Sequence, residues 1–177
     1  MGYVVLSVRC LLGAVFLTSA FTKLRNRRAF EEFTRTVRQL GAPRGLVKAV
    51  ALAVAISEAS IPSLLVSLAP LVTGIGLGLA IVLLGAFVAG ILRTLRRGTA
   101  VPCRCFGSST TPLGRRHVVR NALLTAAAAT GLVGVITGAP NAPTAGGAVL
   151  AAVVGLVGAV LVVMFDDVVD LVAAPSP

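Results

Sequence analysis

This sequence has little charge: only 12% of its 177 residues are Asp, Glu, Lys or Arg, whereas 56% are hydrophobic. About a quarter of the residues of an average soluble domain are charged. The scarcity of charge excludes an ordinary soluble domain, and the long apolar runs indicate a membrane protein. No secretory signal is obvious, because the N-terminus lacks a basic segment and Arg9 interrupts the first apolar run. Without a recognisable repeat or a separate soluble region, residues 1–177 are predicted to form one transmembrane domain.

Acidic residues are also few, six against sixteen basic ones, which leaves a net charge of +10. Such a charge can indicate nucleic-acid binding, but here the basic residues fall in two loops separated by apolar segments of membrane length. This distribution is typical of the loops of a membrane protein. We therefore expect membrane lipid to be the nearest partner, and we expect no binding of nucleic acid.

Five segments are apolar and close to the ~20 residues that a helix needs to cross the hydrocarbon core. We predict an all-α, polytopic transmembrane helical bundle, with spans at about 3–21, 49–68, 71–92, 122–137 and 148–165. Between the first two spans, Phe30, Phe33, Val37 and Leu40 recur at helical spacing. They predict a short amphipathic helix over about 29–40, either lying in the membrane interface or packed as a helix hairpin under the bundle.

The charge of the loops predicts the orientation of the chain. The loops after spans one and three are rich in Arg and Lys, whereas the loops after spans two and four have no charge. Because basic loops stay in the cytoplasm, we expect a multi-pass protein of the plasma membrane with its N-terminus outside. The loop of Cys103 and Cys105 and the C-terminus are then cytoplasmic.

Cysteine is scarce too, yet two of the three cysteines, Cys103 and Cys105, lie one residue apart in a basic loop. Nearby arginines favour a thiolate, so the pair is a candidate redox or metal site. A disulfide between them would close a small, strained and easily reduced ring. In the metal alternative, His117, the only histidine, joins the two thiolates, but three ligands are an incomplete set. The remaining alternative is two ordinary cysteines.

Charged residues inside the predicted spans are costly unless they are neutral, paired or exposed to water. We expect Glu58, near the middle of the second span, to pair with Arg9 of the first span. The functional alternative is a proton-handling Glu58 that serves thiol chemistry or a quinone. Lys23 lies at the end of the first span, where its ammonium group can extend to the lipid headgroups instead of taking part in a site within the bundle. Cys10, alone in its helix, is expected to be a buried inert thiol.

Three stretches together are similar to a known family. They are Phe21-Thr22-Lys23-Leu24 followed by the Phe30/Phe33 helix, Glu58, and Cys103-Arg104-Cys105-Phe106-Gly107 leading to Arg120-Asn121. In these the chain resembles the MauE family of methylamine-utilisation membrane proteins, which are related to DoxX-like bundles. The resemblance implies a four-helix DoxX-like core plus one span.

The resemblance also implies a function beside a thioredoxin-like partner, in forming or maintaining disulfides of an exported protein such as an amine dehydrogenase subunit. Cys103 and Cys105 would be the redox pair of a thiol-disulfide oxidoreductase, with Lys23, Glu58, Arg120 and Asn121 as supporting residues. A quinone or a metal ion is a candidate cofactor. The rival hypothesis is a non-catalytic membrane scaffold or small-molecule carrier. The redox hypothesis carries a conflict, because its substrates are outside while loop charge puts the cysteines inside.

Overall fold

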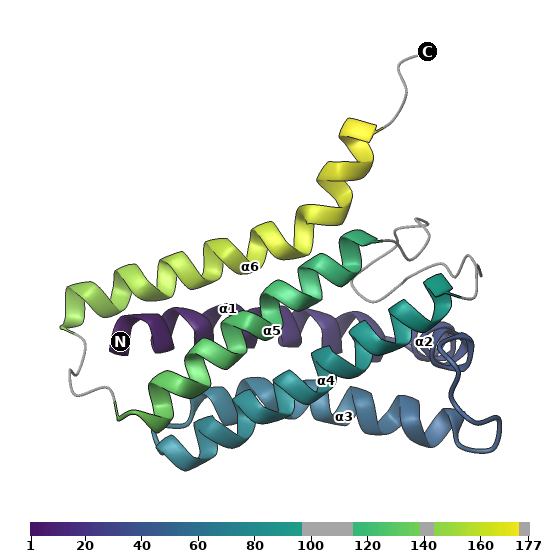
Figure 1. Cartoon of the computed structure of the whole chain (residues 1–177), viewed down its shortest axis with the longest axis horizontal. Coiled ribbons are helices and arrows are strands. Elements are labelled where there is room, and N and C mark those ends of the chain that lie inside the picture. Colours follow the sequence, from purple (N-terminus) through teal and green to yellow (C-terminus); the bar gives the residue numbers. More distant parts are fainter. Residues whose placement is uncertain (97–114, 139–143, 174–177) are drawn as a thin grey trace.

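The computed structural model describes residues 1–96, 115–138 and 144–173 of the chain, and for 115 and 165–173 only the course of the backbone. All the regular elements in these ranges are α-helices (Figure 1). In chain order they are α1 (Gly2–Leu24), α2 (Arg27–Gln39), α3 (Val47–Val66), α4 (Pro70–Arg96), α5 (Arg115–Ile136) and α6 (Ala145–Ala173).

Five of these helices, all except α2, are long and apolar enough to cross a membrane. Large apolar side chains are exposed around the bundle, where a soluble protein would carry polar ones. The exposed side chains include Leu17, Phe21, Val82, Leu123 and Leu161. Lipid is the solvent that suits such a surface. The predicted all-α polytopic bundle with five spans is therefore confirmed.

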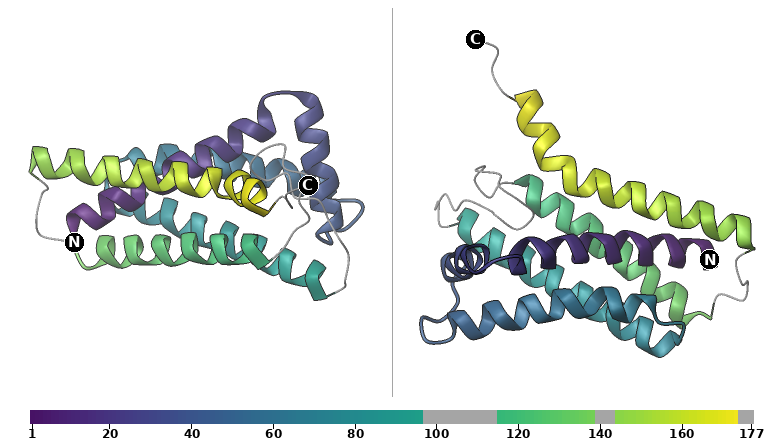
Figure 2. Two further views of the ribbon diagram at one scale, coloured as in Figure 1. Left: turned by 90° about the horizontal axis from the view of Figure 1, so that it is seen from above. Right: turned by 180° about the vertical axis from the view of Figure 1, so that it is seen from behind.

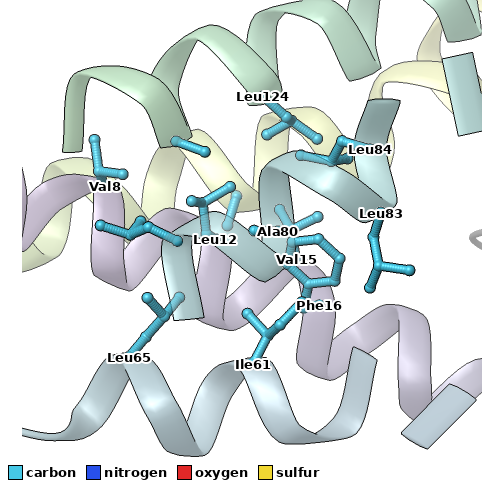
Figure 3. Packing of buried hydrophobic residues seen from close by; sticks show 13 residues of the cluster. Val8, Leu12, Val15, Phe16, Ile61, Leu65, Ala80, Leu83, Leu84 and Leu124 are labelled. Atoms are coloured by element: carbon cyan, nitrogen blue, oxygen red, sulfur yellow. The ribbon is translucent and has the colours of Figure 1, made fainter. Parts of the chain in front are cut away.

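Helix α1 lies at the centre of the bundle (Figures 1 and 2). It packs against α3, α5 and α6, while α4 covers the side formed by α3 and α5. The apolar core lies where α1, α3, α4 and α5 meet (Figure 3). Leu12 of α1, Ile61 of α3 and Leu77 of α4 are fully buried there. In lipid no hydrophobic driving force acts between helices. These residues therefore hold the spans together through the van der Waals contacts of close packing.

Small residues allow α1 to approach its neighbours closely. A Cβ atom placed on Gly155 of α6 would overlap the backbone carbonyl oxygen of Ser7. The hydroxyl of Ser7 donates a hydrogen bond of 2.8 Å to the carbonyl oxygen of Ala151, across the same contact. On the other side of α1, a Cβ on Gly131 of α5 would lie 2.9 Å from Val8. Glycine is thus required for helix contact at these positions.

Helix α2 runs across one end of the bundle (Figure 2). It begins at Asn26, whose side chain accepts a hydrogen bond of 2.8 Å from the backbone amide of Ala29. Phe33 and Val37 on its apolar face pack against Val47 and Ala51 of α3. The exposed face carries several arginines, which suits the boundary between a bundle and water.

Helix α5 begins at Arg115, earlier than the sequence-based boundary at Ala122. The added turns are polar, so hydropathy alone does not detect them. They extend α5 to the end of the bundle where α2 lies and where α4 ends at Arg96. As a result His117, Arg120 and Asn121 belong to a helix that packs against the bundle.

Candidate functional site

The most unusual feature inside the bundle is a buried ion pair between Lys23 of α1 and Glu58 of α3. The Nζ atom of Lys23 lies 2.5 Å from Oε1 and 2.6 Å from Oε2 of Glu58. Both side chains are only 1% exposed. A charge at this depth costs several kcal/mol unless a partner compensates it, so each residue stabilises the other.

Ser19 completes the hydrogen bonding of this pair. It lies one turn before Lys23 on α1, so both side chains point from the same face of that helix. The Nζ atom of Lys23 donates to Ser19 Oγ at 2.9 Å, and Ser19 Oγ donates to Glu58 Oε2 at 3.3 Å. The three N–H groups of the ammonium are therefore satisfied.

Two aromatic rings surround the ammonium group of Lys23. Its Nζ atom lies 4.6 Å from the centre of the Phe33 ring and 5.4 Å from the centre of the Phe87 ring. The faces of aromatic rings carry partial negative charge and attract cations at such distances. Helices α2 and α4 thereby help to stabilise the charge that α1 brings into the membrane.

A small cavity of about 20 Å³ adjoins the ion pair, which is room for about one water molecule. Its polar lining comes from the spans α1, α3 and α5 and from α2, and includes the pair itself together with the first turns of α5. The polar lining residues are Ser19, Lys23, Thr36, Glu58, His117, Arg120 and Asn121. His117, Arg120 and Asn121 are each 5% exposed, so they are buried like the pair.

The lining of this cavity contains more cationic than anionic groups. Lys23 and Arg120 carry positive charge, and among the lining residues that the structure describes Glu58 is the only carboxylate. Cationic groups in a site of low dielectric stabilise a nearby negative charge, such as a thiolate, more strongly than they would in water. The cavity is therefore suited to stabilise an anion or to hold an exchangeable proton.

The expected pair between Arg9 and Glu58 is wrong. Arg9 instead donates from Nε to the carbonyl oxygen of Leu65 at 2.5 Å, and from a terminal nitrogen to that of Ser67 at 2.6 Å. These carbonyls lie at the C-terminal end of α3, where the last carbonyls lack partners within the helix and attract a cation.

The difference in depth along α1 explains this correction. Arg9 lies about 21 Å from Lys23 at a rise of 1.5 Å per residue. Because α3 runs antiparallel to α1, the side chain opposite Glu58 is Lys23, and Arg9 reaches the far end of α3. Arg9 therefore does not belong to the cavity. Lys23 is buried at the pair rather than extended to lipid headgroups.

Cys103, Cys105 and the loop around them lie outside the described residues. The helix ends that flank this loop, at Arg96 and Arg115, lie at the end of the bundle that holds the cavity. Cys10 is half-buried on α1, and a Cβ on Gly155 of α6 would lie 2.9 Å from its Cβ atom. In the described part of the chain, no group of three or more His, Cys, Asp or Glu is arranged to hold a metal ion.

Of the supporting residues predicted from the sequence, Lys23, Glu58, Arg120 and Asn121 line one cavity. The sequence reasoning missed Ser19 and Phe87, and it named Phe33 only as part of the amphipathic helix and not as a neighbour of Lys23. Ser19 has a recognisable signal, because it lies four residues before Lys23 and therefore on the same face of the helix. The aromatic contacts have none, because phenylalanine is common in membrane spans and its partner depends on packing.

Five apolar helices around a buried ion pair define a multi-pass integral membrane protein. Residues 1–134 match the family described as methylamine utilisation protein MauE. The chain belongs to this family. No curated protein and no solved structure matches it.

Proposed function

We propose that this protein is a thiol-disulfide redox accessory of the membrane, with Cys103 and Cys105 as its redox pair. A thioredoxin-like protein is its partner, and the products are disulfides of an exported protein. The observation that supports this best is the buried cavity around Lys23 and Glu58. It lies at the end of the bundle where α4 and α5 are joined by the segment that carries both cysteines.

Each group has a defined task in the proposed reaction. The thiolate of one cysteine attacks a sulfur of the partner's disulfide, which forms a mixed disulfide and releases a partner thiolate. The second cysteine then attacks the first, so the protein's dithiol is oxidised and the partner's disulfide is reduced. Disulfide formation in the exported protein uses the reverse of these steps: the partner's dithiol reduces the Cys103–Cys105 disulfide, and the oxidised partner passes its disulfide on. A quinone, or another two-electron acceptor, then reoxidises the cysteine pair. Lys23 and Arg120 favour the thiolate through their charge. The Lys23–Glu58 pair positions this cationic lining.

The single cysteine variants are expected to behave differently from each other. Removing the attacking cysteine abolishes exchange, whereas removing the resolving cysteine leaves the mixed disulfide with the partner unresolved. Non-reducing gels of Cys103→Ser and Cys105→Ser would then show a high-mass, reductant-sensitive band in only one variant. Cys10→Ser is the matched control and should retain exchange.

Two results would contradict this proposal. One is a stoichiometric metal ion that both single variants lose equally, which would indicate a metal site. The other is an alkylation assay in which Cys103 and Cys105 do not change together when reductant is added. A scaffold or carrier predicts this second result.

We further propose that the N-terminus is outside and that the cysteine loop and the C-terminus are cytoplasmic. The charge asymmetry between alternate loops supports this orientation. In a background without native cysteines, an impermeant maleimide applied to intact cells is expected to label Ala142→Cys but neither Thr99→Cys nor Arg115→Cys. Labelling of Thr99→Cys from outside would reverse the orientation. Redox exchange with an exported partner would then take place directly at the outer face.

A further inference from the structure

We propose that an anionic phospholipid binds in a lateral groove between α4 and the α2–α3 side of the bundle. The groove is a hollow of about 470 Å³, separate from the buried cavity. Val37 of α2, Val54 of α3 and Leu83 of α4 are among its apolar lining, and Arg93 of α4 lines it as well. This inference does not depend on the proposed redox function.

The dimensions of the groove suit one acyl chain of one leaflet. Along α4 its lining extends from Leu83 to Arg93, which is about 15 Å at 1.5 Å per residue. One leaflet accounts for about half of a hydrocarbon core that is ~30 Å thick. An acyl chain that lies along this apolar face therefore brings its phosphate to the level of Arg93.

The charge at the end of the groove selects the headgroup. Arg93 is exposed in the last turn of α4, at the end of the bundle with most of the basic residues. In the described part of the chain the ion pairs are Lys23–Glu58 and Arg28–Glu32, so no acidic side chain described there neutralises Arg93. A basic group at the membrane surface beside an apolar groove favours an anionic phospholipid over a zwitterionic one.

The groove and the buried cavity share part of one wall. Leu40 and Phe87 line both, and the Phe87 ring lies 5.4 Å from the ammonium of Lys23. An acyl chain in the groove would therefore pack on the outer side of the residues that enclose the ion pair. Gly90 lines the groove beside Leu40, because a Cβ placed there would lie 3.3 Å from the Leu40 side chain.

Native mass spectrometry of the detergent-purified full chain tests this proposal. The protein is incubated with an equal mixture of phosphatidylglycerol and phosphatidylcholine, and the ratio of the two retained lipids is measured. We expect roughly a fivefold preference for phosphatidylglycerol, because one basic residue near an anionic headgroup contributes about 1 kcal/mol. Arg93→Gln is expected to reduce the ratio to about one.

Two further variants separate the headgroup contact from the acyl-chain contact. Arg96→Gln is the matched control, since Arg96 is exposed on the same helix but does not line the groove, and it should retain the preference. Ala86→Phe adds a ring to the groove lining and should lower the retention of both lipids. Equal retention in the wild type, a preference that persists in Arg93→Gln, or a dimer without retained lipid would overturn the proposal.

Discussion

Replacing Lys23 with methionine is expected to lower the free energy of unfolding by about 3–5 kcal/mol, the largest effect of any single change in the cavity. The substitution keeps most of the volume of the side chain but leaves Glu58 as an uncompensated buried charge. Unfolding of the purified protein in mixed detergent micelles, followed by circular dichroism, measures the difference.

The double variant Lys23→Met/Glu58→Leu separates loss of charge compensation from loss of packing. Removing both charges should restore much of the stability, because no unpaired charge remains. Glu58→Gln alone should cost less than Glu58→Leu alone, since the amide can still hydrogen-bond to Lys23 and Ser19. A Lys23→Met variant as stable as the wild type would show that the pair is not buried.

A second large effect is expected at the contact between α1 and α6. Gly155→Ala should lower the free energy of unfolding by roughly 1–3 kcal/mol, because the added methyl group overlaps the Ser7 carbonyl and neither backbone can move aside cheaply. The hydrogen bond from Ser7 to Ala151 would lengthen as α6 moves away. Thermal unfolding in detergent, together with proteolysis of α6, measures the loss.

Gly13→Ala provides the control for this effect. Gly13 lies in the middle of α1, and in the part of the chain that the structure describes no atom outside the adjoining backbone lies within 4 Å of a Cβ placed there. Alanine favours the helix by about 1 kcal/mol relative to glycine, so this variant should be at least as stable as the wild type. Equal losses in both variants would contradict the close contact at Gly155.

The sequence predicts the spans well because a membrane-crossing helix must satisfy its backbone internally and present apolar side chains to lipid. These demands leave a strong local signal in each span. The start of α5 is less visible, since His117, Arg120 and Asn121 are polar and gain their burial from other helices. The cavity they line depends on packing, which hydropathy does not report.

The partner of Glu58 shows the same limit. Both Arg9 and Lys23 lie on α1, and either could compensate a carboxylate on α3. The choice depends on the relative depth of the two helices, because Arg9 and Lys23 lie about 21 Å apart along α1. By contrast, the family resemblance singled out four supporting residues, and all four line one cavity. They are Lys23, Glu58, Arg120 and Asn121.

The contacts of Arg9 and Lys23 also bear on the order in which the chain is assembled during synthesis. Both cations emerge from the ribosome with α1, but Arg9 needs the carbonyls of Leu65 and Ser67, and Lys23 needs Glu58. An unpaired cation costs about 2.5–3.5 kcal/mol in the centre of a span and less toward its ends, so Arg9 contributes more of this cost than Lys23, which lies in the last turn of α1. Until α3 has been translated, the insertion of α1 alone into lipid is therefore unfavourable. The nascent α1 should remain beside the insertion machinery and enter the bilayer together with α3.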